Sequence, residues 1–458
     1  MSEAPASRSP LTRTSFRLPF LVLGGLGLLA GLDAALALLG LPHVLVGARL
    51  ADVHGPLMVL GFVGTVIGLE RSVALGRAWG YLAPALNGLG VLATISVLPD
   101  AVGAGLILAG QLGGLFVYRS LYRRQPAAAV AVQVLGSLMA VAAATLWLGG
   151  VAVPALMPWL VGYLVLTIFG ERLELARLGV LSPKDSVAAQ VIAVLVVISA
   201  VVSLLAPDAG FTLLGLSLLA AAGWLAVKDV ARRTVNATGL PRFIAACLLA
   251  GYVWMGVAGA IWALGGQVEG RAYDAAAHAL FLGFVISMIM AHAPVIMPAV
   301  LRRPLPYHPA FIVPAVLLHL TLVFRLAVGD ARDLEWAVQA GGVGNIVAVL
   351  GFVAVAVWSA VRARTAQPPA GTGSPAAVPT TAQPSAATRA PADPAATATA
   401  RPGDAAPANS AAPSSSASTG DDRANPPAPS SSTNADRAHP PAPSPIPLVR
   451  STTPGASS

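Results

Sequence analysis

The chain is organised by long apolar runs that alternate with short polar segments. From residue 18 to residue 361 these runs recur at lengths of about 18 residues or more, enough for a helix to cross about 30 Å of hydrocarbon. Their apolar positions are continuous and do not alternate, which favours membrane-spanning helices over the strands of a barrel. The pattern predicts an all-α polytopic membrane protein.

Twelve spans are predicted. Their ranges are 18–41, 53–75, 80–98, 101–121, 127–149, 153–171, 186–206, 210–228, 241–264, 275–300, 308–328 and 335–361. Eleven further runs follow the first one, so we interpret the first as a retained helix and not as a cleaved signal peptide.

Positive charges predict the orientation of these spans. With the N-terminus inside, nineteen Lys and Arg residues lie on inner segments, and only Arg49, Arg271, Arg325 and Arg332 lie on outer ones. This is the positive-inside pattern, and it places both termini in the cytoplasm of a bacterial-type plasma (inner) membrane. The net charge of +8 is carried in these short loops, so it indicates the lipid bilayer as partner and not nucleic acid.

Composition divides the chain into three parts. Apolar residues make up 56% of the whole and charged residues 10%, whereas Pro, Ala, Ser and Thr dominate the C-terminal region. We predict a disordered cytoplasmic N-terminus over 1–17, a transmembrane domain over 18–364 and a disordered cytoplasmic tail over 365–458. The single cysteine, Cys247, excludes a disulfide or a thiolate metal cage within the chain.

Three segments share one short pattern, and they fall in spans two, six and ten. Their sequences are HGPLMVLGFVGTVIGLER from His54, MPWLVGYLVLTIFGER from Met157 and HALFLGFVISMIMAH from His278. When they are aligned on a Gly-aromatic pair, an ionisable residue follows nine positions after each glycine: Glu70, Glu171 and His292. This internal similarity predicts three parallel repeats of four helices.

Histidines within the bilayer are candidates for function because ionisable groups are costly there. His54 and His278 lie near the outer ends of spans two and ten, at depths that differ by about 3 Å. Two such imidazoles could bind one haem iron from opposite sides. The structural alternative is that each caps a helix end and bonds to the nearby Asp52 or Asp274.

Two further histidines are weaker candidates for metal or haem ligands. His292 lies near the cytoplasmic end of span ten, where it could serve a second site or a proton path or simply cap the helix. His319 lies at mid-span in the eleventh run, where a hydrogen bond to a neighbouring carbonyl is the alternative.

The pairs Glu70-Arg71 and Glu171-Arg172 are interpreted as local structural ion pairs at the inner surface. The run ERLELAR, which begins at Glu171, places opposite charges at helical spacing.

The twelve spans and the histidines of spans two and ten resemble the haem–copper oxidase subunit I superfamily. The phrases HGPLMVLGF and HALFLGFVISMIMAH resemble the smaller NnrS-type membrane proteins, which bind haem and copper. The resemblance implies that His54 and His278 are the axial ligands of a haem b. Residues 153–206 contain no histidine, so the copper ligands of the oxidases are absent and neither a terminal oxidase nor a nitric oxide reductase is expected.

Three functions remain open from the sequence. The first is a membrane haem protein that acts in electron transfer, with a redox partner, or in the response to nitric oxide. The second is a secondary transporter or channel, for which Asn87, Gln111, Gln133, Gln190 and Asn345 supply polar groups within spans. The third is a structural or assembly membrane protein without a cofactor.

Overall fold

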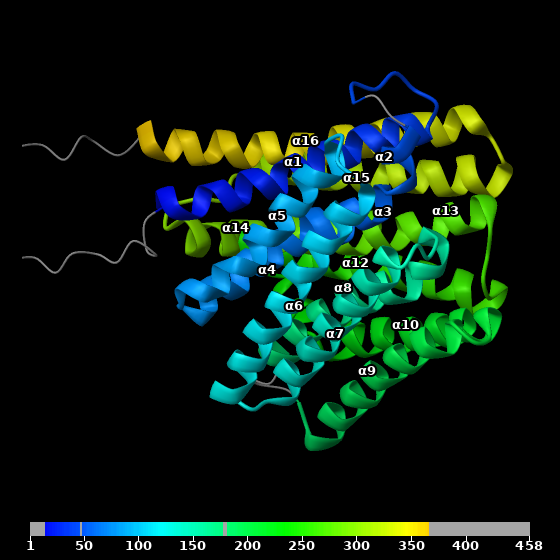
Figure 1. Cartoon of the computed structure of the whole chain (residues 1–458). Helices are drawn as coiled ribbons and strands as arrows, with labels where there is room; N and C mark the ends of the chain where they lie inside the picture. Colours follow the sequence, from blue (N-terminus) through cyan, green and yellow to red (C-terminus); the bar gives the residue numbers. More distant parts are fainter. Residues whose placement is uncertain (1–13, 46–47, 177–180, 366–458) are drawn as a thin grey trace, which may run out of the picture. The chain divides into compact units, whose positions relative to one another are not determined.

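The computed structural model describes residues 14–45, 48–176 and 181–365. These residues form helices joined by short connections, and no strand occurs among them (Figure 1). The helices belong to a compact unit, Met1–Ser374, whereas the second unit, Pro375–Ser458, lies outside the described residues. The predicted disorder of the tail therefore stays a prediction.

The elements in chain order are α1 (Thr14–Leu38), α2 (Ala48–Asp52), α3 (His54–Pro56), η2 (Leu57–Val63), α4 (Gly64–Leu75), η3 (Ala78–Tyr81), α5 (Leu82–Ile95), α6 (Asp100–Arg124), α7 (Ala128–Leu148), α8 (Val153–Ala176), α9 (Pro183–Ser203), α10 (Pro207–Lys228), α11 (Ala231–Thr234), α12 (Leu240–Gly265), α13 (Gly270–His278), η4 (Ala279–Ile286), α14 (Ser287–Leu301), η5 (Pro309–Phe311), α15 (Ile312–Phe324), η6 (Arg325–Gly329), η7 (Asp330–Arg332) and α16 (Glu335–Thr365).

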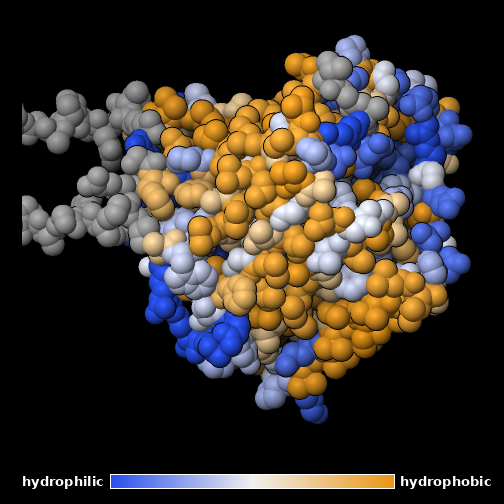
Figure 2. Space-filling model, viewed as in Figure 1, coloured by the Kyte–Doolittle hydropathy of each residue, from blue (hydrophilic) through white to orange (hydrophobic). Residues whose placement is uncertain are grey.

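Twelve described helices are long and apolar enough to cross a membrane, which confirms the predicted number of spans. On the face shown in Figure 2, apolar residues form a broad surface and hydrophilic residues gather toward its ends. Both ends of the helical domain differ from the prediction, because the last helix extends to Thr365, the first residue of the predicted tail. The first helix begins at Thr14, so residues 14–17 are helical and not part of a disordered N-terminus. Residues 1–13 lie outside the described residues.

Helix α8, the sixth span, is the most enclosed of the twelve. Within its apolar window 83% of the residues are buried, compared with 22% in the last span. It packs against α7, α9 and α10, and it also contacts the π-helical segments of spans two and ten. An apolar helix with no polar face is expected in such a central position.

Spans two and ten share a local irregularity. Each begins as an α-helix and continues as a π-helix, over Leu57–Val63 in span two and over Ala279–Ile286 in span ten. The aligned glycines, Gly61 and Gly283, both lie inside these segments. π-helical turns are rare and occur often at functional sites. In both spans the π-helix follows within three residues of a candidate histidine.

Candidate functional site

His54 is the first residue of α3, and its ring is held by the neighbouring first helix. Its Nδ1 donates a hydrogen bond of 2.9 Å to the backbone carbonyl of Gly31 in α1. The predicted alternative partner was Asp52, so the contact differs from that expectation. Because a carbonyl only accepts, the proton lies on Nδ1 and the lone pair on Nε2.

His278 is the last residue of α13, and it is bonded within its own helix. Its Nδ1 lies 2.8 Å from the carbonyl oxygen of Asp274 and 3.2 Å from Oδ1 of the same residue. Asp274 is in turn bound by Arg325 of η6, whose Nη2 lies 2.8 Å and 3.0 Å from the two carboxylate oxygens. The predicted bond to Asp274 is therefore present, and it fixes Nδ1 as the donor in this ring as well.

The two imidazoles lie within electrostatic range of each other, although they come from segments more than 200 residues apart. Asp274 and Arg325 belong to the same neighbourhood. Among the described residues, none forms a hydrogen bond with Nε2 of either ring, and neither atom is sealed off by packing. The side chain of His278 keeps 21% of its surface exposed. Both rings therefore present an available lone pair.

A buried carboxylate beside this pair was not predicted from the sequence. Asp330 in η7 is 7% exposed, and both of its oxygens are enclosed without a hydrogen-bond partner in the described part of the chain. Its neighbours include the charged groups of Asp274 and Arg325 and the imidazole of His278. The sequence contains a pattern that could have indicated this residue. Arg325 and Asp330 are charged residues at the end of an apolar run on the predicted outer side, where positive residues are scarce.

His292 and His319 are not brought together with each other or with the His54–His278 pair by any described contact. His292 donates from Nδ1 to the carbonyl of Met288, and its Nε2 lies 3.4 Å from Nη1 of Arg172. Nδ1 of His319 accepts a hydrogen bond from the indole of Trp254. Among the described residues no group of three or more His, Cys, Asp or Glu is arranged to hold a metal ion. The two residues thus find protein partners where metal ligation was considered.

Of the two charged pairs at the predicted inner ends of spans two and six, Glu70–Arg71 forms as predicted and Glu171–Arg172 does not form among the described residues. Arg71 contacts Glu70, its neighbour in sequence, at 3.2 Å, and it also pairs closely with Glu171 of α8. Arg172 pairs with Asp229, with 2.6 Å from Nε to Oδ2 and 2.8 Å from Nη2 to Oδ1. The expected local pair between Glu171 and Arg172 is not found among the described residues. Both arginines instead join separate segments of the chain.

Asp229 is the most completely bonded of these groups. It also accepts hydrogen bonds from the hydroxyl of Tyr252, at 2.7 Å, and from the backbone N–H of Ala231, at 2.8 Å. Burial alone would raise the pKa of the Asp229 carboxyl, but the hydrogen bonds and positive charge of Arg172 outweigh that effect and hold the pKa below its usual value. The carboxylate is therefore ionised and structural.

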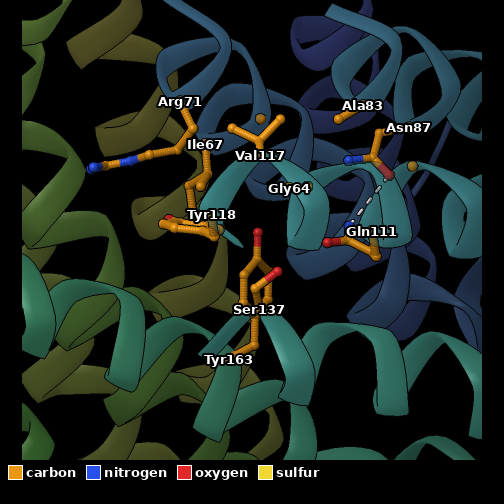
Figure 3. A pocket seen from close by; sticks show the side chains of 13 residues that line it. Gly64, Ile67, Arg71, Ala83, Asn87, Gln111, Val117, Tyr118, Ser137 and Tyr163 are labelled. Carbon is orange, nitrogen blue, oxygen red and sulfur yellow. Dashed lines mark hydrogen bonds between the residues drawn. The ribbon is translucent and has the colours of Figure 1, made fainter. Parts of the chain in front are cut away.

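A small cavity with several polar side chains in its wall lies between spans two to six. Figure 3 shows Asn87 and Gln111 joined by a hydrogen bond of 3.3 Å, with the hydroxyl groups of Tyr163 and Ser137 nearby. Small residues, among them Gly64, leave this space open because a Cβ there would lie 2.7 Å from the Gln111 amide nitrogen. The cavity offers about 10 Å³ to the centre of a water molecule, which is room for about one.

Comparison with known families supplies a classification without a function. No curated protein matches this chain. The model of one family, described as a domain of unknown function (DUF8744), matches residues 17–361, which include all but the outermost residues of the twelve spans. The chain therefore belongs to this family of unknown function.

Proposed function

We propose that this chain is an integral-membrane haem protein in which His54 and His278 are the axial ligands of one b-type haem. The observation that carries the proposal is that the two imidazoles have the same tautomer and the same kind of hydrogen bond. Each donates Nδ1–H to a backbone carbonyl, each has Nε2 without a described partner, and the two lie within electrostatic range.

The chemistry of this donor set fits haem iron. Histidines that bind a metal commonly donate their other ring N–H to a carbonyl or carboxylate, which fixes the tautomer and strengthens the ligand. Gly31 has this role for His54, and Asp274, held by Arg325, has it for His278. When bound, a haem with two histidine ligands supplies one-electron chemistry, which suits electron transfer or a response to nitric oxide.

The proposal includes the predicted repeat and orientation. Three parallel four-helix units would place the histidines of spans two and ten near the outer ends of corresponding helices, and the paired π-helical segments support that correspondence. The contacts from Arg71 to Glu171 and from Arg172 to His292 are also consistent with it, since each links one unit to the next. Both termini would then lie in the cytoplasm of a bacterial-type inner membrane.

The test is a visible absorption spectrum of the purified, dithionite-reduced protein, produced with ample haem. Wild type is expected to show sharp α and β bands, which His54→Ala and His278→Ala each remove. His43→Ala is the matched control, because His43 is an exposed histidine of the same predicted outer side and bonds only to the carbonyl of Leu41. A colourless, correctly folded wild type would overturn the proposal.

A secondary transporter is the second candidate, and the cavity of Figure 3 favours it. Asn87 and Gln111 are buried polar groups within spans three and four, and they border a space large enough for a water molecule. Transporters place polar groups at such depths. Under this alternative the protein stays colourless, and substitution of Gln111 by Leu impairs transport while His54→Ala does not.

A further inference from the structure

The predicted inner ends of spans two and six gather more negative than positive charge. Arg71 is shared by two carboxylates, those of Glu70 and Glu171. No second described cation pairs with either carboxylate, because Arg172 pairs with Asp229 instead. These three groups therefore carry one surplus negative charge. Their side chains are only 14% to 25% exposed, so water screens that charge poorly.

His292 is the nearest group that could neutralise the surplus by taking a proton, and its contacts argue against that. Its Nδ1–H already donates to Met288, and its Nε2 faces the guanidinium of Arg172 at 3.4 Å. A proton on Nε2 would set two cations against each other. The imidazole is therefore neutral, and the charge must be balanced on the carboxylates.

We propose that Glu70 and Glu171 together bind one proton, which resides mainly on Glu70. Two carboxylates that share one cation are stabilised when one of them is protonated. Glu171 has the closer contact with Arg71, whereas Glu70 reaches it at 3.2 Å and has no other described hydrogen bond. The titratable and charged groups around the pair are Arg71, Tyr118, Arg172, Glu174, Asp229 and His292.

Two enclosed donors beside the pair have no partner among the described residues. Nε of Arg71 and Nε2 of Gln133 are buried without a hydrogen-bond partner in the described part of the chain. Gln133 is 1% exposed, and its Oε1 lies 3.5 Å from Nη1 of Arg71. Arg71 also borders the cavity of Figure 3, which has room for about one water molecule. Water there would accept from the free donor of Arg71 and give the proton a route of exchange.

Infrared difference spectroscopy on the full-length protein in lipid nanodiscs tests this site through the carbonyl stretch of a protonated carboxyl group. In a titration from about pH 5 to about pH 9, wild type is expected to lose this signal from one more carboxyl per chain than the Gln variants at these two positions. Glu70→Gln and Glu171→Gln each leave one carboxylate for Arg71, so both variants should lack that additional signal.

Glu174→Gln is the matched control, because Glu174 lies on the same helix as Glu171 and is exposed. It should retain the full signal. Gel filtration and circular dichroism establish that each variant is folded. A wild-type carboxyl signal no larger than that of both Gln variants would overturn the proposal. Haem propionates contribute equally to all four proteins, so this outcome is separate from the fate of the haem proposal.

Discussion

The indole Nε1 of Trp254 donates a hydrogen bond of 3.0 Å to Nδ1 of His319, and this contact joins α12 to α15. Nε2 of the ring then carries the proton, which is the opposite tautomer from that of His54 and His278. His319 is thereby distinguished from the two candidate haem ligands. Its substitution by Ala is expected to leave haem absorption in place while it lowers stability.

The position of Trp254 depends on a glycine in span ten. A Cβ added at Gly283 would lie 2.3 Å from Cγ of the indole ring, so the ring would have to move. Gly283→Ala is therefore expected to destabilise the protein by about 1–3 kcal/mol through overpacking and loss of the indole bond. Unfolding in mixed micelles measures the change. At Gly256 in α12 an added Cβ meets nothing within 4 Å, so Gly256→Ala should be neutral or slightly stabilising. Equal effects at both glycines would contradict this explanation.

Removal of the Asp229 carboxylate should have a large effect on stability. Asp229→Ala leaves the guanidinium of Arg172 buried and unpaired, and the expected cost is about 3–5 kcal/mol. Asp185→Ala, which breaks a more exposed pair with Lys228 and a capping contact with Ser182, should destabilise the protein far less. Denaturant unfolding of the two variants compares these costs. A loss at Asp229 no greater than the loss at Asp185 would refute the structural role of the buried pair.

The carboxylate of Asp229 also predicts how the stability of the folded protein depends on pH. The pKa of Asp229 is lower in the folded protein than its ordinary value, so its contribution is present above the unfolded pKa of about 4 and is lost as pH falls below it. Wild type should therefore lose stability on acidification more steeply than Asp229→Asn does. Melting temperatures measured between about pH 6 and pH 3 test this difference, and parallel curves for the two proteins would count against it.

The contact between His278 and the carboxylate of Asp274 should affect the affinity for haem. Asp274→Asn keeps the backbone carbonyl that holds the ring but weakens the carboxylate contact and the link to Arg325. Loss of such a partner typically lowers metal affinity about 10–100-fold, and we expect a loss of that order for haem. Haem titration followed by absorption measures it. Asp333→Asn, at a side chain 82% exposed that pairs with Arg271, is the control and should bind haem as wild type does.

Accessible-cysteine labelling tests the predicted orientation. In a background with Cys247→Ala, cysteines are placed at Arg77, between spans two and three, and at Val97, which is 99% exposed between spans three and four. A membrane-impermeant maleimide added to intact cells should label Val97→Cys and spare Arg77→Cys until the membrane is opened. The reverse pattern would place both termini outside.

The sequence by itself determined the twelve helices, because each apolar run is long enough to span a bilayer and can satisfy its backbone bonds only as a helix. It also singled out His54 and His278, since an imidazole in an apolar helix stands out in any alignment of the segments. Periodicity could not reveal the π-helical turns that follow them, because these depend on how the helices pack.

Only the tertiary structure decided which charges meet. Glu171 is adjacent to Arg172 in sequence, yet it pairs with Arg71, and Arg172 pairs with Asp229. Adjacent residues on a helix point about 100° apart, so neighbours in sequence often face different partners. The link from Asp274 to Arg325, and the indole bond of His319, likewise join residues on separate helices. Such contacts are set by the packing of the bundle, which no local pattern specifies.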